Sequence, residues 1–260
     1  MENFSCPSTA TTESKDNRNA PNPSQNNESK GSDDVQTMEN ATIDTQMDVI
    51  FSQYSYLSIF AALESGNMDK AKALIPLYPE CLTTSRPSDG MTLLTSCAET
   101  GRTDACRLLL NQGVNVNQMA KGVKETREAT AIIMACFGGH VDVVQLLLSV
   151  DGIQVHQGDQ DGYTPLHVAS EEDNVKVLTA LLSRKEIQIT QAANSGATPL
   201  YVACRKGHGK VVNALLARKE IQINQAHNNG ATPLYAACEN GHVKAINALF
   251  GKKRNSNQPR

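Results

Sequence analysis

The apolar and polar residues of this chain follow a pattern that repeats about every 34 residues. Blocks that combine a Thr, several aliphatic residues, small residues and a Gly start near residues 90, 128, 162, 196 and 230, and a weaker copy without the Thr starts near 55. The two best-matched stretches, residues 196–220 and 230–254, are identical at 15 of 25 positions. A fixed period of this length is typical of stacked supersecondary units rather than of one conventional globule.

Each unit is expected to form a helix, a turn, a second helix and a finger, and the fifth unit shows this pattern best. Thr198 can cap the first helix, with Pro199 at its first position, and Gly207 suits the left-handed backbone that ends it. The second helix has an apolar face formed by Val211, Val212, Leu215 and Leu216. Residues 219–223 alternate in polarity, which predicts an extended segment before a turn at 228–230. We therefore predict an all-α repeat solenoid of stacked helix-turn-helix units with short hairpin fingers.

The repeated residues also resemble a known family. Thr164-Pro165-Leu166-His167-Val168-Ala169 is similar to the T-P-L-H-x-A motif of ankyrin repeats, and Gly-His pairs at 139–140, 207–208 and 241–242 resemble their inter-helix turn. The resemblance covers about residues 55–250, and it implies a stacked helical fold whose concave face binds proteins. In the fourth unit Asp173 stands in place of the turn glycine, and Asp tolerates the left-handed conformation better than most residues.

The chain divides into three parts by composition. Residues 1–42 are acidic, rich in Ser, Thr and Asn and almost without aliphatic residues, so we expect a disordered tail. Apolar residues then recur at spacings of three and four, which predicts a helix beginning after Thr42. We place the repeat domain at 43–250 and a short basic tail at 251–260.

The charge of the chain argues against nucleic-acid binding. The net charge is -3, and residues 1–48 hold nine acids and three bases, so the repeats have no strong basic field. No apolar run is long enough to insert into a membrane, and no secretory signal precedes the repeats. Seven scattered cysteines without a C-x-x-C pair favour a reducing compartment. We expect a cytoplasmic protein. The basic run at 252–254 is interpreted as a solvated helix end, and as a nuclear import signal it would place the protein in the nucleus as well.

Neither catalysis nor a bound metal or cofactor is expected, because no common catalytic or phosphate-binding motif occurs. His140, His208 and His242 share one repeat position, so stacking should separate neighbours by about 10 Å, too far for one metal ion. Cys136, Cys204 and Cys238 share another position and are interpreted as small buried apolar residues.

The expected binding surface is the set of positions that vary while the frame of each unit stays constant. Two residues that follow the Ala-Cys positions vary in charge and size from unit to unit, which indicates exposure. The ankyrin resemblance places them on the concave face, together with the residue after each turn glycine. The expected partner-binding residues are Met91, Phe137, Tyr163, Glu171, Glu172, Arg205, Lys206 and Glu239.

We therefore predict a scaffold or adaptor that binds a partner protein through the concave face of the stack. The alternative is a regulatory repeat region, or a fragment, of a larger multidomain enzyme or signalling protein. The finger insert 121–127 is a second candidate binding loop or a tolerated surface insertion.

Two further expectations concern modification and self-association. Asn117 and Asn224 resemble the ankyrin positions used by an asparaginyl hydroxylase. The sixth unit nearly copies the internal fifth unit instead of carrying a polar outer face, so we expect weak end-to-end association, or early fraying, at residues 230–250.

Overall fold

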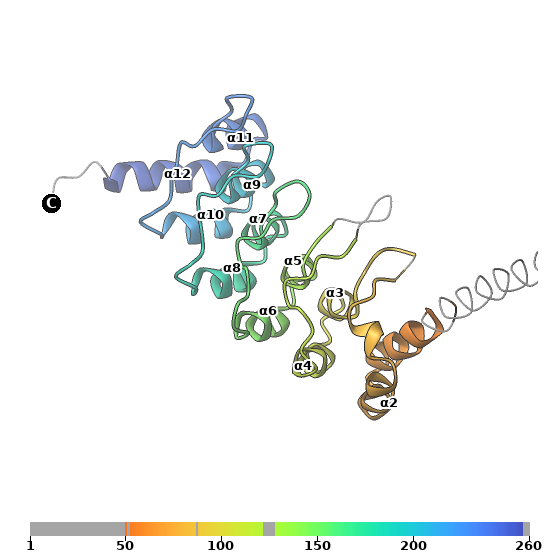
Figure 1. Cartoon of the computed structure of the whole chain (residues 1–260). Coiled ribbons are helices and arrows are strands. Elements are labelled where there is room, and N and C mark those ends of the chain that lie inside the picture. Colours follow the sequence, from red (N-terminus) through yellow and green to blue (C-terminus); the bar gives the residue numbers. More distant parts are fainter. Residues whose placement is uncertain (1–49, 51–52, 87, 122–127, 257–260) are drawn as a thin grey trace, which may run out of the picture. The chain divides into compact units, whose positions relative to one another are not determined.

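The computed structural model describes residues 50, 53–86, 88–121 and 128–256 (Figure 1). Residues 48–260 form one compact unit, and the predicted tail at 1–42 lies outside the described residues. Residues 53–64 are helical. The elements that follow are α2 (Met68–Leu74), η1 (Ile75–Leu77), η2 (Pro79–Leu82), α3 (Leu93–Glu99), α4 (Thr103–Asn111), α5 (Ala131–Phe137), α6 (Val141–Leu148), α7 (Pro165–Glu171), α8 (Val175–Leu182), α9 (Pro199–Lys206), α10 (Gly209–Leu216), α11 (Pro233–Glu239) and α12 (Val243–Ser256).

The first helix of the fifth unit begins and ends as the sequence predicts. Thr198 caps α9 by accepting a hydrogen bond from the backbone N–H of Tyr201, and Pro199 is the first helical residue. Gly207 ends α9 with φ 78°, in the left-handed region. In the fourth unit Asp173 takes the corresponding position with φ 54°. Thr caps and left-handed turn residues therefore set the helix ends from local sequence.

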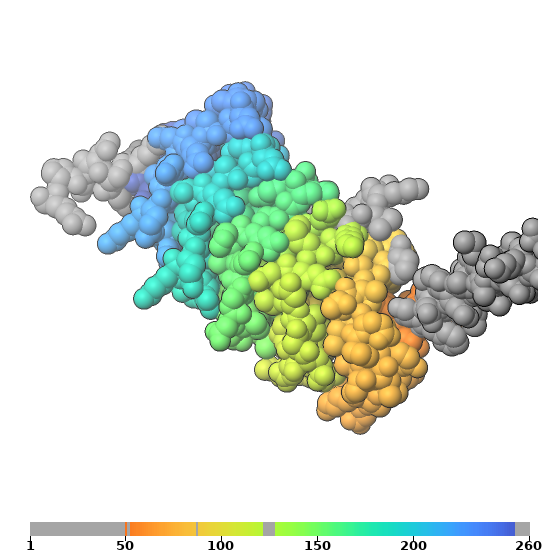
Figure 2. Space-filling model, in the orientation of Figure 1, coloured from red at the N-terminus to blue at the C-terminus, as the bar shows by residue number. Residues whose placement is uncertain are grey.

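The helix pairs stack in chain order. Each first helix contacts the next along the series α3, α5, α7, α9 and α11, and each second helix contacts the next along α4, α6, α8, α10 and α12. In Figure 1 the pairs follow one another from α2 to α12, and Figure 2 shows the units as successive bands of colour. Most of the buried aliphatic residues form one continuous core that runs through these pairs. The fold is the predicted all-α repeat solenoid.

The fingers are turns rather than regular strands. In the sixth unit the backbone N–H of His227 donates to Ala231 at 2.9 Å, and Gly230 N–H donates back to His227 at 2.8 Å. The expected extended segment 219–223 contains turns, and within the described residues no strand pairs with it. Its alternation in polarity instead reflects packing, because Ile221 and Ile223 pack against the core while Gln222 between them is exposed.

Asparagines connect neighbouring fingers. The side chain of Asn194 donates to the carbonyl of Gln160 at 3.0 Å, and Asn228 donates to the carbonyl of Asn194 at 3.0 Å. A Cβ on Gly196 would lie 2.3 Å from Asn228 Oδ1, so only glycine allows this approach. The fingers thus add polar contacts to the apolar contacts between helices.

The helices at both ends of the stack differ from the internal ones. Helix α12 continues to Ser256, beyond the boundary placed at residue 250. At the other end, Ile50, Tyr54 and Leu57 are 46%, 69% and 41% exposed. This apolar stripe faces outward, while Tyr56 and Ile59 of the same helix face the core.

Candidate partner-binding surface

The two variable residues of each unit lie at the carboxyl end of its first helix. All of them are exposed or half-buried, in agreement with the variation between units. We call this set the first-helix surface. It consists of Glu99, Thr100, Phe137, Gly138, Glu171, Glu172, Arg205, Lys206, Glu239 and Asn240.

Phe137 is the most apolar member of the first-helix surface. Its side chain is 53% exposed at the end of α5, whereas Ile133 and Cys136 of the same helix are buried. The following Gly138 lies close to the preceding unit, because a Cβ there would be 2.5 Å from the His140 ring and 2.7 Å from the Glu99 carbonyl oxygen. The backbone after Phe137 is therefore held close to its neighbour while its ring faces solvent.

The charged members of the surface partly neutralise one another. Glu171 Oε1 lies 3.2 Å from Lys206 Nζ and 3.9 Å from Arg205 Nη2 of the next unit. The Glu171 side chain is largely buried, with only 15% of its surface exposed, whereas Glu172 is exposed. Glu171 thus forms an ion-pair cluster with Arg205 and Lys206, whereas Glu172 and Glu239 are exposed.

Side chains at the inter-helix turns fix the backbone of this surface. His140 Nε2 bonds to the Glu99 carbonyl at 2.8 Å, His208 Nε2 to that of Glu171 at 2.8 Å, and His242 Nε2 to that of Arg205 at 3.0 Å. In the fourth unit Asn174 takes the histidine position and donates to the Cys136 carbonyl at 3.3 Å. The sequence predicts that the repeated Gly-His pair forms a turn between helices. It does not predict the hydrogen bond from the histidine to the preceding unit, because that contact forms only when the units are stacked.

The residue after the turn glycine is not generally exposed, so the prediction for Met91 is wrong. Met91 is 3% exposed, and the corresponding Ala129 and Ala197 are also buried. The carbonyl of Met91 accepts hydrogen bonds at 2.8 Å from the Tyr56 hydroxyl of the preceding unit and from the backbone of Arg86. This position belongs to the junction between units.

Tyr163 occupies that same position and, like Ala231, is half-buried. Its ring centroid lies 5.2 Å from that of His167, and its backbone N–H donates to Asp159 Oδ1 at 2.8 Å. The residue is half-buried, so Tyr163 stays a candidate contact residue.

The two asparagines proposed for modification lie in different environments. Asn117 donates its side-chain amide to the Gly152 carbonyl and accepts from Gln154 N–H, both at 2.9 Å, so it bridges to the next unit. Asn224 is exposed. Hydroxylation at either position stays a prediction.

The cysteine interpretation is correct for two residues and wrong for the third. Cys136 and Cys204 are fully buried, and burial raises the pKa of the Cys204 thiol to about 12, which suppresses thiolate formation. Cys238 is exposed because the sixth unit has no following unit among the described residues. In the part of the chain that the structure describes, no group of three His, Cys, Asp or Glu side chains is placed to hold a metal ion.

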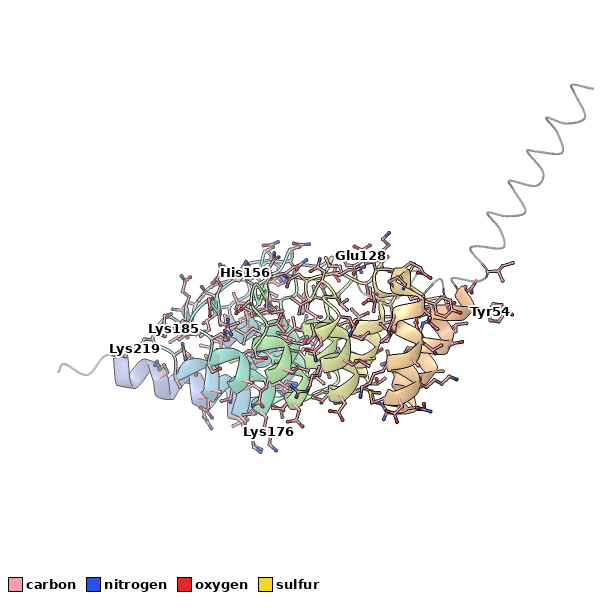
Figure 3. All side chains as sticks on the ribbon, turned by 60° about the horizontal axis from the view of Figure 1, so that its bottom comes forward. Tyr54, Glu128, His156, Lys176, Lys185 and Lys219 are labelled. Carbon is pink, nitrogen blue, oxygen red and sulfur yellow. The ribbon has the colours of Figure 1, made fainter. Side chains whose placement is uncertain are left out.

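The structure also shows which residues lie on the finger side of the stack and which lie on its second-helix side. Figure 3 shows Glu128 and His156 on the finger side and Lys176, from α8, on the opposite side. Of the finger insert, Lys121 is described and donates its backbone N–H to Gly90 at 2.9 Å, whereas 122–127 lie outside the described residues. None of the described helices is both long and apolar enough to cross a bilayer.

These features define a helical repeat protein whose variable surface lies on a constant frame. The ankyrin repeat family model, which spans three copies, matches residues 119–193 and 185–259, and the single ankyrin repeat model matches 89–121. The chain belongs to the ankyrin repeat family. Ankyrin repeats generally mediate protein–protein interactions, and proteins built from them are typically scaffolds without catalytic activity.

A curated relative matches part of this chain. Alpha-latrotoxin-Lg1a from Latrodectus geometricus is 29% identical over 110 residues, which cover 42% of this chain and 8% of the toxin. The chain therefore spans far less than the whole length of that relative.

Proposed function

We propose that this chain is a scaffold or adaptor that binds a partner protein through its first-helix surface. The single observation that carries this proposal is Phe137, a large apolar side chain that is 53% exposed on a helix in which Ile133 and Cys136 are buried. Exposed aromatic side chains are common energetic centres of protein interfaces.

The surroundings of Phe137 suggest the chemistry of the partner. Glu99, half-buried, lies in the preceding unit, and Glu172, exposed, lies in the following one. A partner segment with an apolar side chain flanked by basic groups would complement this arrangement. Because turn side chains already hold the backbone of the surface, little ordering is needed on binding, which reduces the entropic cost.

The proposal is tested by comparing captured partners between two exposed-residue variants. Phe137→Ala, alone and with Tyr163→Ala, removes the aromatic contacts. Leu77→Ala is the matched control, since Leu77 is also a large exposed apolar residue, 68% exposed, but lies in η1 away from the first-helix surface. Quantitative mass spectrometry of cross-linked complexes would identify proteins held by the wild-type chain.

We expect a defined set of proteins to be lost with Phe137→Ala and kept with Leu77→Ala. A direct titration of the best-enriched protein should then show at least a tenfold loss of affinity, about 1.4 kcal/mol, for Phe137→Ala. Equal affinity of the wild-type chain and the Phe137 variant, with unchanged melting of both, would contradict the proposal.

The compartment and weak self-association are further proposals. Among the described residues no disulfide involves Cys97, Cys106, Cys136, Cys204 or Cys238, which supports a reducing compartment such as the cytoplasm. Self-association through the sixth unit is supported by Tyr235 and Phe250, which are 56% and 48% exposed.

A further inference from the structure

The last unit shows which positions of a first helix face the following unit. Tyr201 is 6% exposed in the fifth unit, but Tyr235, at the same position of the sixth unit, is 56% exposed. Cys204 is buried, whereas the corresponding Cys238 is exposed. The third and sixth positions of each first helix therefore point toward the carboxyl-terminal end of the stack.

The second helix of the last unit gives the same result. Leu216 of α10 is 4% exposed, and the corresponding Phe250 of α12 is 48% exposed. Ala245 and Leu249 of α12 stay buried, because they face α10. Tyr235, Cys238, Ile246 and Phe250 thus form an apolar end that we call the C-terminal face.

The first unit shows the complementary set of positions. Val202, at the fourth position of α9, is buried, and Ala236, at the same position of α11, is only 1% exposed. In the first unit the corresponding Ala61 is exposed. The fourth position therefore faces the preceding unit. Ile50, Tyr54, Leu57 and Ala61 form what we call the N-terminal face, and Figure 3 shows Tyr54 at that outer end.

The internal junction indicates how these two faces fit each other. Tyr201 and Ala236 belong to one buried cluster, so the third position of the fifth unit packs near the fourth position of the sixth. The C-terminal face offers a tyrosine, Tyr235, at the third position, and the N-terminal face offers an alanine, Ala61, at the fourth. The tyrosine and the alanine that pack together at the internal junction therefore recur as Tyr235 on the C-terminal face and Ala61 on the N-terminal face.

We propose that copies of this chain associate head to tail, with the C-terminal face of one copy against the N-terminal face of the next. This inference rests on the self-association proposed above and adds its polarity. Contact through two different faces leaves one of each open, so the association continues into longer chains instead of stopping at a closed dimer.

The experiment uses the full chain and blocks one face at a time. Tyr235→Glu places a charge on the C-terminal face, and Ala61→Glu places one on the N-terminal face. Both positions are exposed in the single chain, so the fold tolerates the change. Gln145→Glu, an exposed position on the internal helix α6, adds the same charge away from both faces and is the control.

Sedimentation velocity from low to high micromolar concentration should show wild-type and control masses rising past the dimer. Each blocked variant alone should stay monomeric, and an equal mixture of the two should form a one-to-one dimer and nothing larger. Circular dichroism checks folding, and Leu57→Ser replaces Ala61→Glu if the latter loses helicity.

Two outcomes would overturn the inference, and they differ from each other. If Ala61→Glu associates as the wild type does while Tyr235→Glu is monomeric, the contact joins two C-terminal faces, and only the polarity is wrong. If the wild-type chain is monomeric throughout, self-association itself fails as well.

Discussion

At the scale of single residues, His167 carries the clearest dependence on pH. It is fully buried in α7, where Nδ1 lies 2.8 Å from Thr164 Oγ1 and Nε2 lies 2.9 Å from the Ala197 carbonyl of the next unit. Burial lowers the pKa of His167 from 6.5 to about 4, although the Ala197 carbonyl opposes this shift. The folded protein therefore keeps this imidazole neutral at pH values where the unfolded chain protonates it.

This pKa shift predicts a loss of stability in mild acid. Above pH 6.5 the imidazole of His167 is neutral in both the folded and the unfolded state, so its contribution to the free energy of unfolding is fully present. As the pH falls from 6.5 to about 4, only the unfolded state binds the proton, which costs about 3 kcal/mol of unfolding free energy by the end of this range. Urea denaturation at a series of pH values measures the loss.

His167→Gln is the matched variant for that measurement. A Gln at this position can still accept from the Thr164 backbone, as in a capping box, but it does not titrate. Its unfolding free energy should fall less between pH 6.5 and 4 than that of the wild type. The same pH dependence in both proteins would show that His167 is not the group responsible.

At the scale of elements, the fifth and sixth units form a natural comparison. Their sequences are similar enough that intrinsic helix propensity differs little, so burial is the main difference between α9 and α10 on one side and α11 and α12 on the other. The sixth unit lacks a following unit among the described residues and exposes Tyr235 and Phe250.

We predict that amides of α11 and α12 exchange faster than the corresponding amides of α9 and α10. Burying one aromatic or leucine side chain contributes about 2 kcal/mol, so the free energy of local opening should be lower by at least that amount in the sixth unit. Native-state hydrogen exchange at a concentration where the chain is monomeric gives these values residue by residue. Equal protection in both units would contradict the expectation of fraying and indicate that another segment covers this end.

The sequence predicted what depends on local geometry and missed what depends on neighbours. The caps at Thr198 and Pro199 and the left-handed residues Gly207 and Asp173 follow from short-range sterics and hydrogen bonds, and the structure confirms them. The burial of Met91 depends on contacts across a junction between units. Periodicity within one unit carries no information about that contact.

The same limit applies to the candidate site. Variation between units predicted the exposure of Phe137 and Glu172, because a packed position does not accept such different side chains. It did not predict that Glu171 pairs with Lys206, since that contact joins residues 35 positions apart. An ion pair between two units can be predicted only when the spatial offset from one unit to the next is known.

At the scale of the whole molecule, the acidic amino-terminal segment and the repeats are expected to differ in protease resistance. Residues 1–42 contain three tryptic sites, at Lys15, Arg18 and Lys30. From its composition we predict that trypsin cleaves at these sites before it cleaves within the stacked helices. Mass spectrometry of a time course identifies the fragments, and early cleavage at Arg184 with Lys30 intact would contradict the prediction.

The turn histidines have a consequence for exchanging units between proteins of this type. His208 belongs to the fifth unit, yet it holds the carbonyl of Glu171 in the fourth, and His242 likewise holds Arg205 of the fifth. The backbone carbonyls of Glu171 and Arg205, two candidate contact residues, are therefore held in part by the unit that follows. A unit transferred alone would bring its side chains but not the histidine of the following unit that bonds to its backbone carbonyl. The smallest transferable module is one first helix together with the next inter-helix turn.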